Sequence, residues 1–124
     1  MRILLIDDEV EILSLLKDTL ESFGYEVEMA LDGEMGVDMF KESINNGKKF
    51  DLLIIDYRMY GKDGLQVSKE VMDIDKNTKI LFASADPSIK KKVIEMGAVG
   101  FLLKPFTIRE LIDTIKNISS RNKT

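Results

Sequence analysis

Polar residues that could carry chemistry stand directly after four short apolar runs of this sequence. They are three carboxylates, one hydroxyl and one ammonium group: Asp7, Asp8, Asp56, Ser84 and Lys104. The carboxylates and the lysine together carry a net formal charge of −2, which is unfavourable in one cleft unless a carboxylate is protonated or a cation is bound. Oxygen ligands favour a hard ion such as Mg²⁺, and a Mg²⁺ ion with open positions can bind phosphoryl oxygens. Taken singly, Asp7 and Asp8 could cap a helix, and Asp56 could be an ordinary loop residue. The joint occurrence of these groups at strand ends favours phosphoryl chemistry.

The apolar runs predict the elements that would position these side chains. Four runs are too short for helices and do not alternate with polar residues, which is typical of strands buried on both faces of a parallel sheet. These runs are Ile3–Ile6, Leu52–Ile55, Ile80–Ala83 and Phe101–Leu103. A fifth segment, Tyr25–Met29, alternates apolar and charged residues and predicts an edge strand. Because the carboxyl ends of parallel strands meet at one edge of a sheet, we expect the polar residues to converge there.

Amphipathic stretches separate the strands, and their apolar residues recur at helical intervals of three and four. Asp86–Pro87 is a helix-opening signal, Thr107 and Glu110 have the spacing of a capping box, and Gly24 and Gly97 are stop signals. The apolar stripes are Leu13–Leu16–Leu20–Phe23, Val37–Phe40–Ile44, Val67–Val71–Ile74, Ile89–Val93–Met96 and Ile108–Leu111–Ile112–Ile115–Ile118. Strict alternation of strand and helix predicts a doubly wound α/β domain.

Composition narrows the function classes. The length of 124 residues fits one domain, expected over residues 1–118, with 119–124 a short frayed tail and no output domain after it. The net charge of −4 argues against direct nucleic-acid binding. Cysteine and histidine are absent, so a thiolate site is excluded and any phosphohistidine must belong to a partner. The N-terminal apolar run is too short for a signal peptide or membrane insertion, so a cytoplasmic location is expected.

The chain resembles the response-regulator receiver family over residues 2–118. The ordered motifs that carry the resemblance are Leu5–Ile6–Asp7–Asp8–Glu9, Leu53–Ile54–Ile55–Asp56 with Met59 and Asp63–Gly64, Ser84–Ala85, Gly97–Ala98, Phe101 and Lys104–Pro105–Phe106. The resemblance implies a flavodoxin-like five-stranded parallel sheet in the order 2-1-3-4-5 with five helices. It also implies a signalling module that catalyses only its own phosphorylation and dephosphorylation, rather than an enzyme.

The resemblance also implies roles for individual residues. Asp56 would be the phosphoryl acceptor, and a Mg²⁺ ion, for which Mn²⁺ can substitute, would be held by Asp8, Asp56, the backbone carbonyl of Arg58 and, through water, Asp7. The donor would be a sensor histidine kinase or a histidine phosphotransfer protein.

A second group would respond to the phosphoryl group. Lys104 would pair with the phosphoryl oxygens, and the Lys104–Pro105 bond would be cis. Ser84, with Ala85 next to it, would move toward the phosphate while Phe101 turns inward. A downstream protein target is expected on the face formed by the fourth helix, the fifth strand and the fifth helix.

Three alternative functions agree less well with the sequence. A phosphatase of the haloacid-dehalogenase type needs Asp-x-Asp after its first strand, whereas the sequence has Asp7–Asp8–Glu9. A flavin-binding module needs a small-residue loop at that place. A degenerate receiver that signals by binding alone conflicts with the intact Asp8, Asp56 and Lys104. Arg58 departs from the common pattern: it could hinder access to the acceptor or pair with Glu9.

Overall fold

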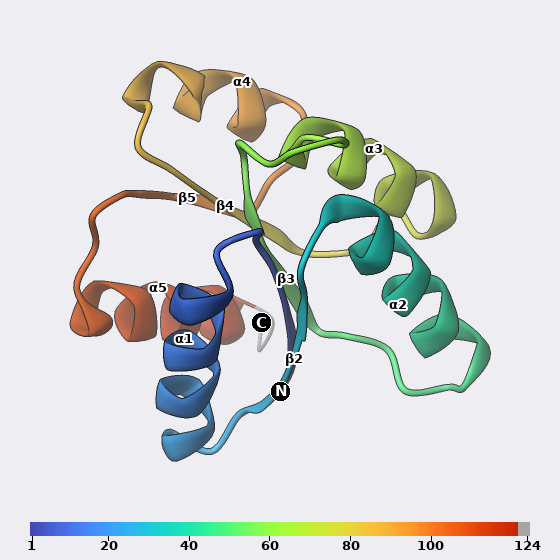
Figure 1. The fold of residues 1–124 in the computed structure, drawn as a ribbon, viewed down its shortest axis with the longest axis horizontal. Coiled ribbons are helices and arrows are strands. Elements are labelled where there is room, and N and C mark those ends of the chain that lie inside the picture. Colours follow the sequence, from blue (N-terminus) through green and yellow to red (C-terminus); the bar gives the residue numbers. More distant parts are fainter. Residues whose placement is uncertain (122–124) are drawn as a thin grey trace.

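Five parallel strands form one sheet in the computed structural model, which describes residues 1–121 (Figure 1). The strands are β1 (Arg2–Ile6), β2 (Glu26–Ala30), β3 (Leu52–Asp56), β4 (Ile80–Ser84) and β5 (Gly100–Leu103). Their order is β2-β1-β3-β4-β5, and every neighbouring pair is parallel. The predicted doubly wound, flavodoxin-like α/β fold is confirmed. The direction of winding reverses between β1 and β3, where ligand sites form in such sheets.

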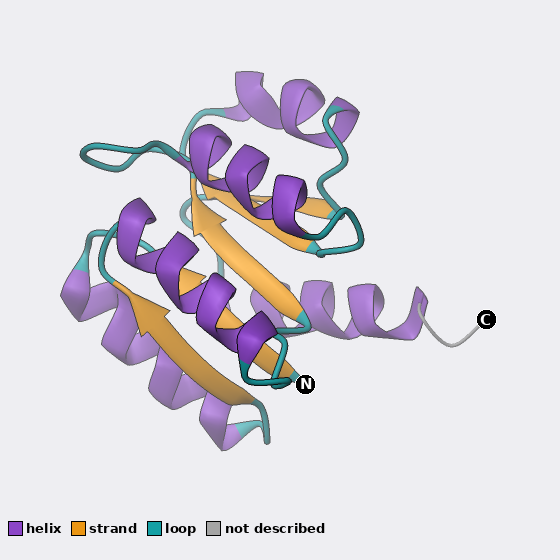
Figure 2. Cartoon of the chain, turned by 90° about the vertical axis from the view of Figure 1, so that its right-hand side faces the viewer, coloured by secondary structure: helices purple, strands orange, loops and turns teal. Residues whose placement is uncertain are grey.

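Helices cover both faces of the sheet, as the view turned by 90° shows (Figure 2). They are α1 (Val10–Ser22), α2 (Gly33–Asn45), α3 (Gly64–Ile74), α4 (Lys90–Glu95), which follows the 3₁₀ turn η1 (Pro87–Ile89), and α5 (Ile108–Ser120). Helices α1 and α5 lie on one face, and α2, α3 and α4 lie on the other (Figure 1). This arrangement explains why four of the strands have no polar residue at alternate positions.

Alternate residues of the central strands enter two separate cores. In β1, Leu4 and Ile6 pack on the side of α2, α3 and α4, whereas Ile3 and Leu5 pack on the side of α1 and α5. All four side chains are buried. Since each fully buried aliphatic side chain contributes roughly 1.5–3 kcal/mol, the two cores hold the ends of the strands, and hence the site, in fixed relative positions.

The edge strand and the helix caps follow the local signals. In β2, Glu26 and Glu28 are exposed while Val27 is buried, as expected for an edge strand. Asp86 accepts a hydrogen bond from Ser88 N at the start of η1. Thr107 forms a capping box with the residue three positions later at the start of α5. These short-range predictions are confirmed because cap bonds depend only on residues within one turn of each other.

Helix α5 continues beyond the predicted end of the domain. Ser119 and Ser120 belong to α5, although the sequence analysis assigns them to a frayed tail. The helix end is held to the sheet, because the Arg121 side chain donates a hydrogen bond to the Val99 carbonyl at 3.1 Å. The rest of the expected tail, residues 122–124, lies outside the described residues. Within residues 1–121, no helix is both long and apolar enough to span a membrane.

Candidate functional site

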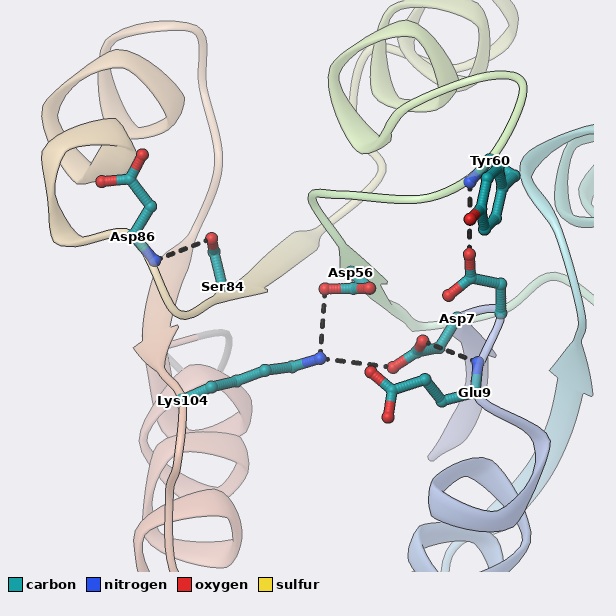
Figure 3. Close-up of polar contacts among 8 residues, drawn as sticks. Asp7, Glu9, Asp56, Tyr60, Ser84, Asp86 and Lys104 are labelled. Carbon is teal, nitrogen blue, oxygen red and sulfur yellow. Dashed lines mark hydrogen bonds and ion pairs between the residues drawn. The ribbon is translucent and has the colours of Figure 1, made fainter.

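Four strand ends bring the candidate residues together. Asp56 is the last residue of β3 and Ser84 is the last residue of β4. Asp7 directly follows β1, and Lys104 directly follows β5. The close-up view shows their side chains at one edge of the sheet, where Lys104 extends toward Asp56 and Asp7 (Figure 3). The convergence expected from the sequence is therefore present.

Three carboxylates form an acidic cluster that fits a hard divalent cation. One oxygen from each of Asp7, Asp8 and Asp56 lies within 4.8 Å of the other two. Asp7 and Asp56 are only 6% and 7% exposed, and Asp8 is half-buried. Like charges this close raise one another's pKa or attract a cation, and a set of oxygen donors suits Mg²⁺. The donor chemistry thus matches the predicted metal.

Lys104 supplies part of the compensating charge. Its Nζ atom lies 3.1 Å from Asp56 Oδ1 and 3.4 Å from Asp7 Oδ2. Burial lowers the pKa of the lysine, but the charges of Asp56 and Asp7 raise it by a larger amount. The pKa of Lys104 is therefore above its usual value. The ammonium group therefore stays charged and donates to both carboxylates. The Lys104–Pro105 peptide bond is cis.

The Asp56 carboxyl is electrostatically strained despite the lysine. Burial and the charge of Asp7 raise the pKa of Asp56 from 3.8 to about 6, and together outweigh the opposing effect of Lys104. At neutral pH the group is mostly ionised. The same environment makes the ionised form costly, so binding a cation beside it relieves the strain.

Neighbouring loops orient the acidic side chains through backbone groups. Glu9 N donates to Asp7 Oδ1 at 3.1 Å, and Tyr60 N donates to Asp8 Oδ2 at 3.2 Å (Figure 3).

Gly64, at the start of α3, lets the β3–α3 loop close over β3. A Cβ atom there would lie 2.7 Å from the Asp56 carbonyl oxygen and 2.9 Å from a backbone carbon of the next residue. Glycine at this position is therefore required by close packing rather than by its φ angle.

The residues expected to act as a switch lie at the end of β4 and within β5. Ser84 is 2% exposed, and its Oγ accepts a hydrogen bond from Asp86 N at 3.1 Å. Its hydroxyl is directed toward Asp86 rather than Asp56 (Figure 3). Ala85 is exposed on the β4–α4 loop. Phe101 is half-buried in β5 and packs against the core under α2, α3 and α4.

Arg58 pairs with Asp86, a partner not expected from the sequence. Its guanidinium Nη2 lies 3.3 Å from Asp86 Oδ2, across the gap between the β3–α3 and β4–α4 loops. The alternative partner named from the sequence, Glu9, is thus not the one bonded. The sequence identifies Asp86 only as a helix cap, and no local signal could reveal this contact, because it joins residues 28 positions apart.

Comparison with known proteins gives consistent matches. The sequence model of the family described as "Response regulator receiver domain" matches residues 3–116. Transcriptional regulatory protein CpxR of Escherichia coli strain K12 is 35% identical over 122 residues, which cover 98% of this chain and 50% of CpxR. The chain therefore spans about half the length of the curated relatives that it matches first.

Solved structures agree with the sequence matches. A response regulator receiver domain protein from Clostridium thermocellum superposes with a TM-score of 0.89 at 31% identity, covering 98% of this chain and 96% of that one. The response regulator TrrA from Thermotoga maritima, solved in complex with Mg²⁺ and BeF, has a TM-score of 0.82 at 33% identity, with coverage of 94% and 96%.

Proposed function

The chain belongs to the response regulator receiver family, and on this premise we propose that Asp56 accepts a phosphoryl group from a phosphohistidine of a partner protein. A receiver domain is a signalling module of two-component systems rather than a classical enzyme. The observation that carries the proposal is the position of the Asp56 carboxylate, buried at the end of β3 between the Lys104 ammonium group and the acidic cluster.

The transfer step requires a nucleophile and charge compensation. An Asp56 carboxylate oxygen attacks phosphorus, the new P–O bond forms, and the P–N bond to the imidazole of the partner breaks. Lys104 exchanges its contact with Asp56 for the phosphoryl oxygens, which carry most of the charge in the transition state. A histidine that donates the phosphoryl group must lie outside these 124 residues, since they contain none. A sensor histidine kinase or a histidine phosphotransfer protein would serve.

The acidic cluster would hold the cation that this reaction needs. Asp8, Asp56 and the backbone carbonyl of Arg58 would be direct ligands of Mg²⁺ or Mn²⁺, and Asp7 would act through water. When bound, the ion neutralises charge on the phosphoryl oxygens. Asp7 and Asp8 are already oriented for this role by backbone N–H groups. The crystallised complex of TrrA with Mg²⁺ and BeF supports the assignment by similarity.

A conformational switch would carry the signal outward. A phosphoryl group on Asp56 adds charge and acceptor oxygens, which attract the Ser84 hydroxyl and the Ala85 backbone, and Phe101 then fills the space that Ser84 leaves. The face formed by α4, β5 and α5 would bind the downstream protein. Each of these three elements carries an exposed apolar side chain: Ile94, Leu103 and Ile108.

Intact-mass spectrometry tests the proposal directly. Incubation of the protein with Mg²⁺ and acetyl phosphate should add one phosphoryl mass, and EDTA should prevent the addition. Asp56→Asn should give no adduct. Asp8→Asn should give an adduct only at higher Mg²⁺ concentration, because one ligand of the ion is weakened.

An exposed carboxylate provides the matched control. Asp18→Asn changes the charge by the same amount in the middle of α1 and should leave the adduct unchanged. An adduct that survives in Asp56→Asn, or that forms equally well in EDTA, would contradict the assignment of Asp56 and its metal.

A further inference from the structure

We propose that the Arg58–Asp86 ion pair holds the β4–α4 loop in its resting conformation and so keeps the Ser84 hydroxyl away from Asp56. Arg58 and Asp86 would thus be positioning residues for phosphorylation. The inference rests on the function proposed above. It concerns two residues that the acceptor, metal and switch assignments leave without a side-chain role.

Asp86 joins three parts of the molecule. Its Oδ1 accepts hydrogen bonds from Ser88 N at 2.9 Å and from Ser88 Oγ at 2.6 Å, which fixes the carboxylate at the start of η1. Its Oδ2 faces the Arg58 guanidinium at 3.3 Å. Its backbone N–H donates to Ser84 Oγ at 3.1 Å. A movement of the Asp86 backbone therefore changes the environment of the Ser84 hydroxyl.

Arg58 anchors this arrangement to the acceptor strand. It stands two residues after Asp56 in the loop that follows β3, whereas Asp86 stands two residues after Ser84 in the loop that follows β4. The ion pair thus connects corresponding positions of the loops that follow two neighbouring strands. Movement of Ser84 toward a phosphoryl group would require the β4–α4 loop to shift against this connection.

The expected effect is modest because the pair is partly in water. The Arg58 side chain is 74% exposed and the Asp86 side chain is 31% exposed. Ion pairs of this kind change equilibria by about two- to fivefold. The apparent Kd of a ligand that binds only the competent conformation is its intrinsic Kd divided by the fraction of molecules in that conformation. Removing the pair raises this fraction, so it should lower the Kd of a phosphoryl mimic by the same factor.

A double-mutant cycle with beryllofluoride and Mg²⁺ tests the inference. The proteins are the unmodified chain, Arg58→Ala, Asp86→Asn and the double variant, and NMR titration gives the beryllofluoride Kd. Asparagine keeps the cap on Ser88 and the backbone N–H to Ser84, so Asp86→Asn removes only the charge. Each single variant should lower the Kd by about two- to fivefold, and the double variant should lower it no further. Arg58→Lys, which keeps the cation, should remain close to the unmodified chain.

Two further measurements separate positioning from other roles. In a Ser84→Ala background, Arg58→Ala should change the Kd by a smaller factor, because the hydroxyl is gone and only the Ala85 backbone of the restrained loop still responds to the phosphoryl mimic. At 1 M KCl, where the Debye length is about 3 Å, the ratio between the unmodified chain and Arg58→Ala should approach one.

The outcomes distinguish this inference from the proposed function. Failure of the unmodified chain to bind beryllofluoride with Mg²⁺ would overturn both. Normal binding with equal Kd values in all four proteins would overturn the positioning role alone. A higher Kd in Arg58→Ala would also overturn it, since that result would mean that the guanidinium contacts the phosphoryl group directly. Additive effects of the two single variants would show that they do not act as a pair.

Discussion

Replacing Asp56 by asparagine should stabilise the metal-free protein at pH 7.5. Burial and the charge of Asp7 raise the pKa of Asp56 from 3.8 to about 6, against the opposing effect of Lys104. The ionised carboxyl is thus less favourable in the folded protein than in the unfolded chain. Asparagine has nearly the same shape without the charge, so the substitution removes this unfavourable contribution.

The magnitude follows from the shift in pKa. A difference of about two pKa units, at ~1.4 kcal/mol each, corresponds to about 3 kcal/mol at pH 7.5. Because Lys104 loses one of its two carboxylate partners, the measured gain in the free energy of unfolding should lie between about 1 and 3 kcal/mol. The folded pKa is raised, so the favourable contribution of the protonated carboxyl is complete below about pH 4 and is lost as the pH rises through about 6. The gain should therefore fall to roughly half at pH 5.

Urea unfolding in EDTA at pH 5 and pH 7.5 measures this gain. The unmodified chain, Asp56→Asn and the exposed-site control Asp18→Asn are compared at each pH. Addition of Mg²⁺ at pH 7.5 should stabilise the unmodified chain more than Asp56→Asn, because only the former keeps all three carboxylates. The difference between the two proteins should then narrow.

Two results would refute the reasoning. If Asp56→Asn were less stable than the unmodified chain at pH 7.5 in EDTA, the ion pair with Lys104 would outweigh burial and the charge of Asp7. If the gain were the same at both pH values, it would not arise from the ionisation of Asp56. Asp18→Asn should change the free energy of unfolding by less than about 0.5 kcal/mol.

Three other substitutions test the remaining parts of the site and its support. Lys104→Met should lower the free energy of unfolding by about 2 kcal/mol at pH 7.5 in EDTA, because Asp56 and Asp7 lose their shared cation; unchanged stability would contradict this. Gly64→Ala should lower the free energy of unfolding by about 1–3 kcal/mol, since the added Cβ meets the Asp56 carbonyl oxygen at 2.7 Å. It should also slow phosphorylation by acetyl phosphate. An unchanged free energy of unfolding in urea would show that the loop can move without loss of stability. Thr107→Ala should lower the free energy of unfolding by about 1 kcal/mol, because α5 loses its cap. The phosphorylation rate should stay unchanged, and a changed rate would indicate that the cap supports the site.

The sequence by itself determined the fold and the composition of the site. Buried parallel strands must be apolar on both faces, so runs such as Ile3–Ile6 identify them without knowledge of their neighbours. The cap at Thr107 depends only on nearby residues and was equally predictable. Because the carboxyl ends of parallel strands share one edge, the proximity of Asp7, Asp56 and Lys104 also followed from strand assignment alone. The sequence predicts that the last helix ends at residue 118, whereas α5 continues to Ser120, and the next side chain, Arg121, donates to the distant Val99 carbonyl.

The tertiary structure decided the contacts on which the electrostatics and the switch depend. Arg58 could have paired with Glu9, but the folded chain brings its guanidinium to Asp86 instead. The Ser84 hydroxyl accepts a hydrogen bond from the N–H of Asp86, two residues later, and only the tertiary structure links this local turn to Arg58. The raised pKa of Asp56 likewise reflects burial beneath loops and the approach of Asp7. These properties depend on distances of a few ångströms between residues far apart in the chain. Because electrostatic energies vary steeply with such distances, they cannot be predicted from residue type and spacing alone.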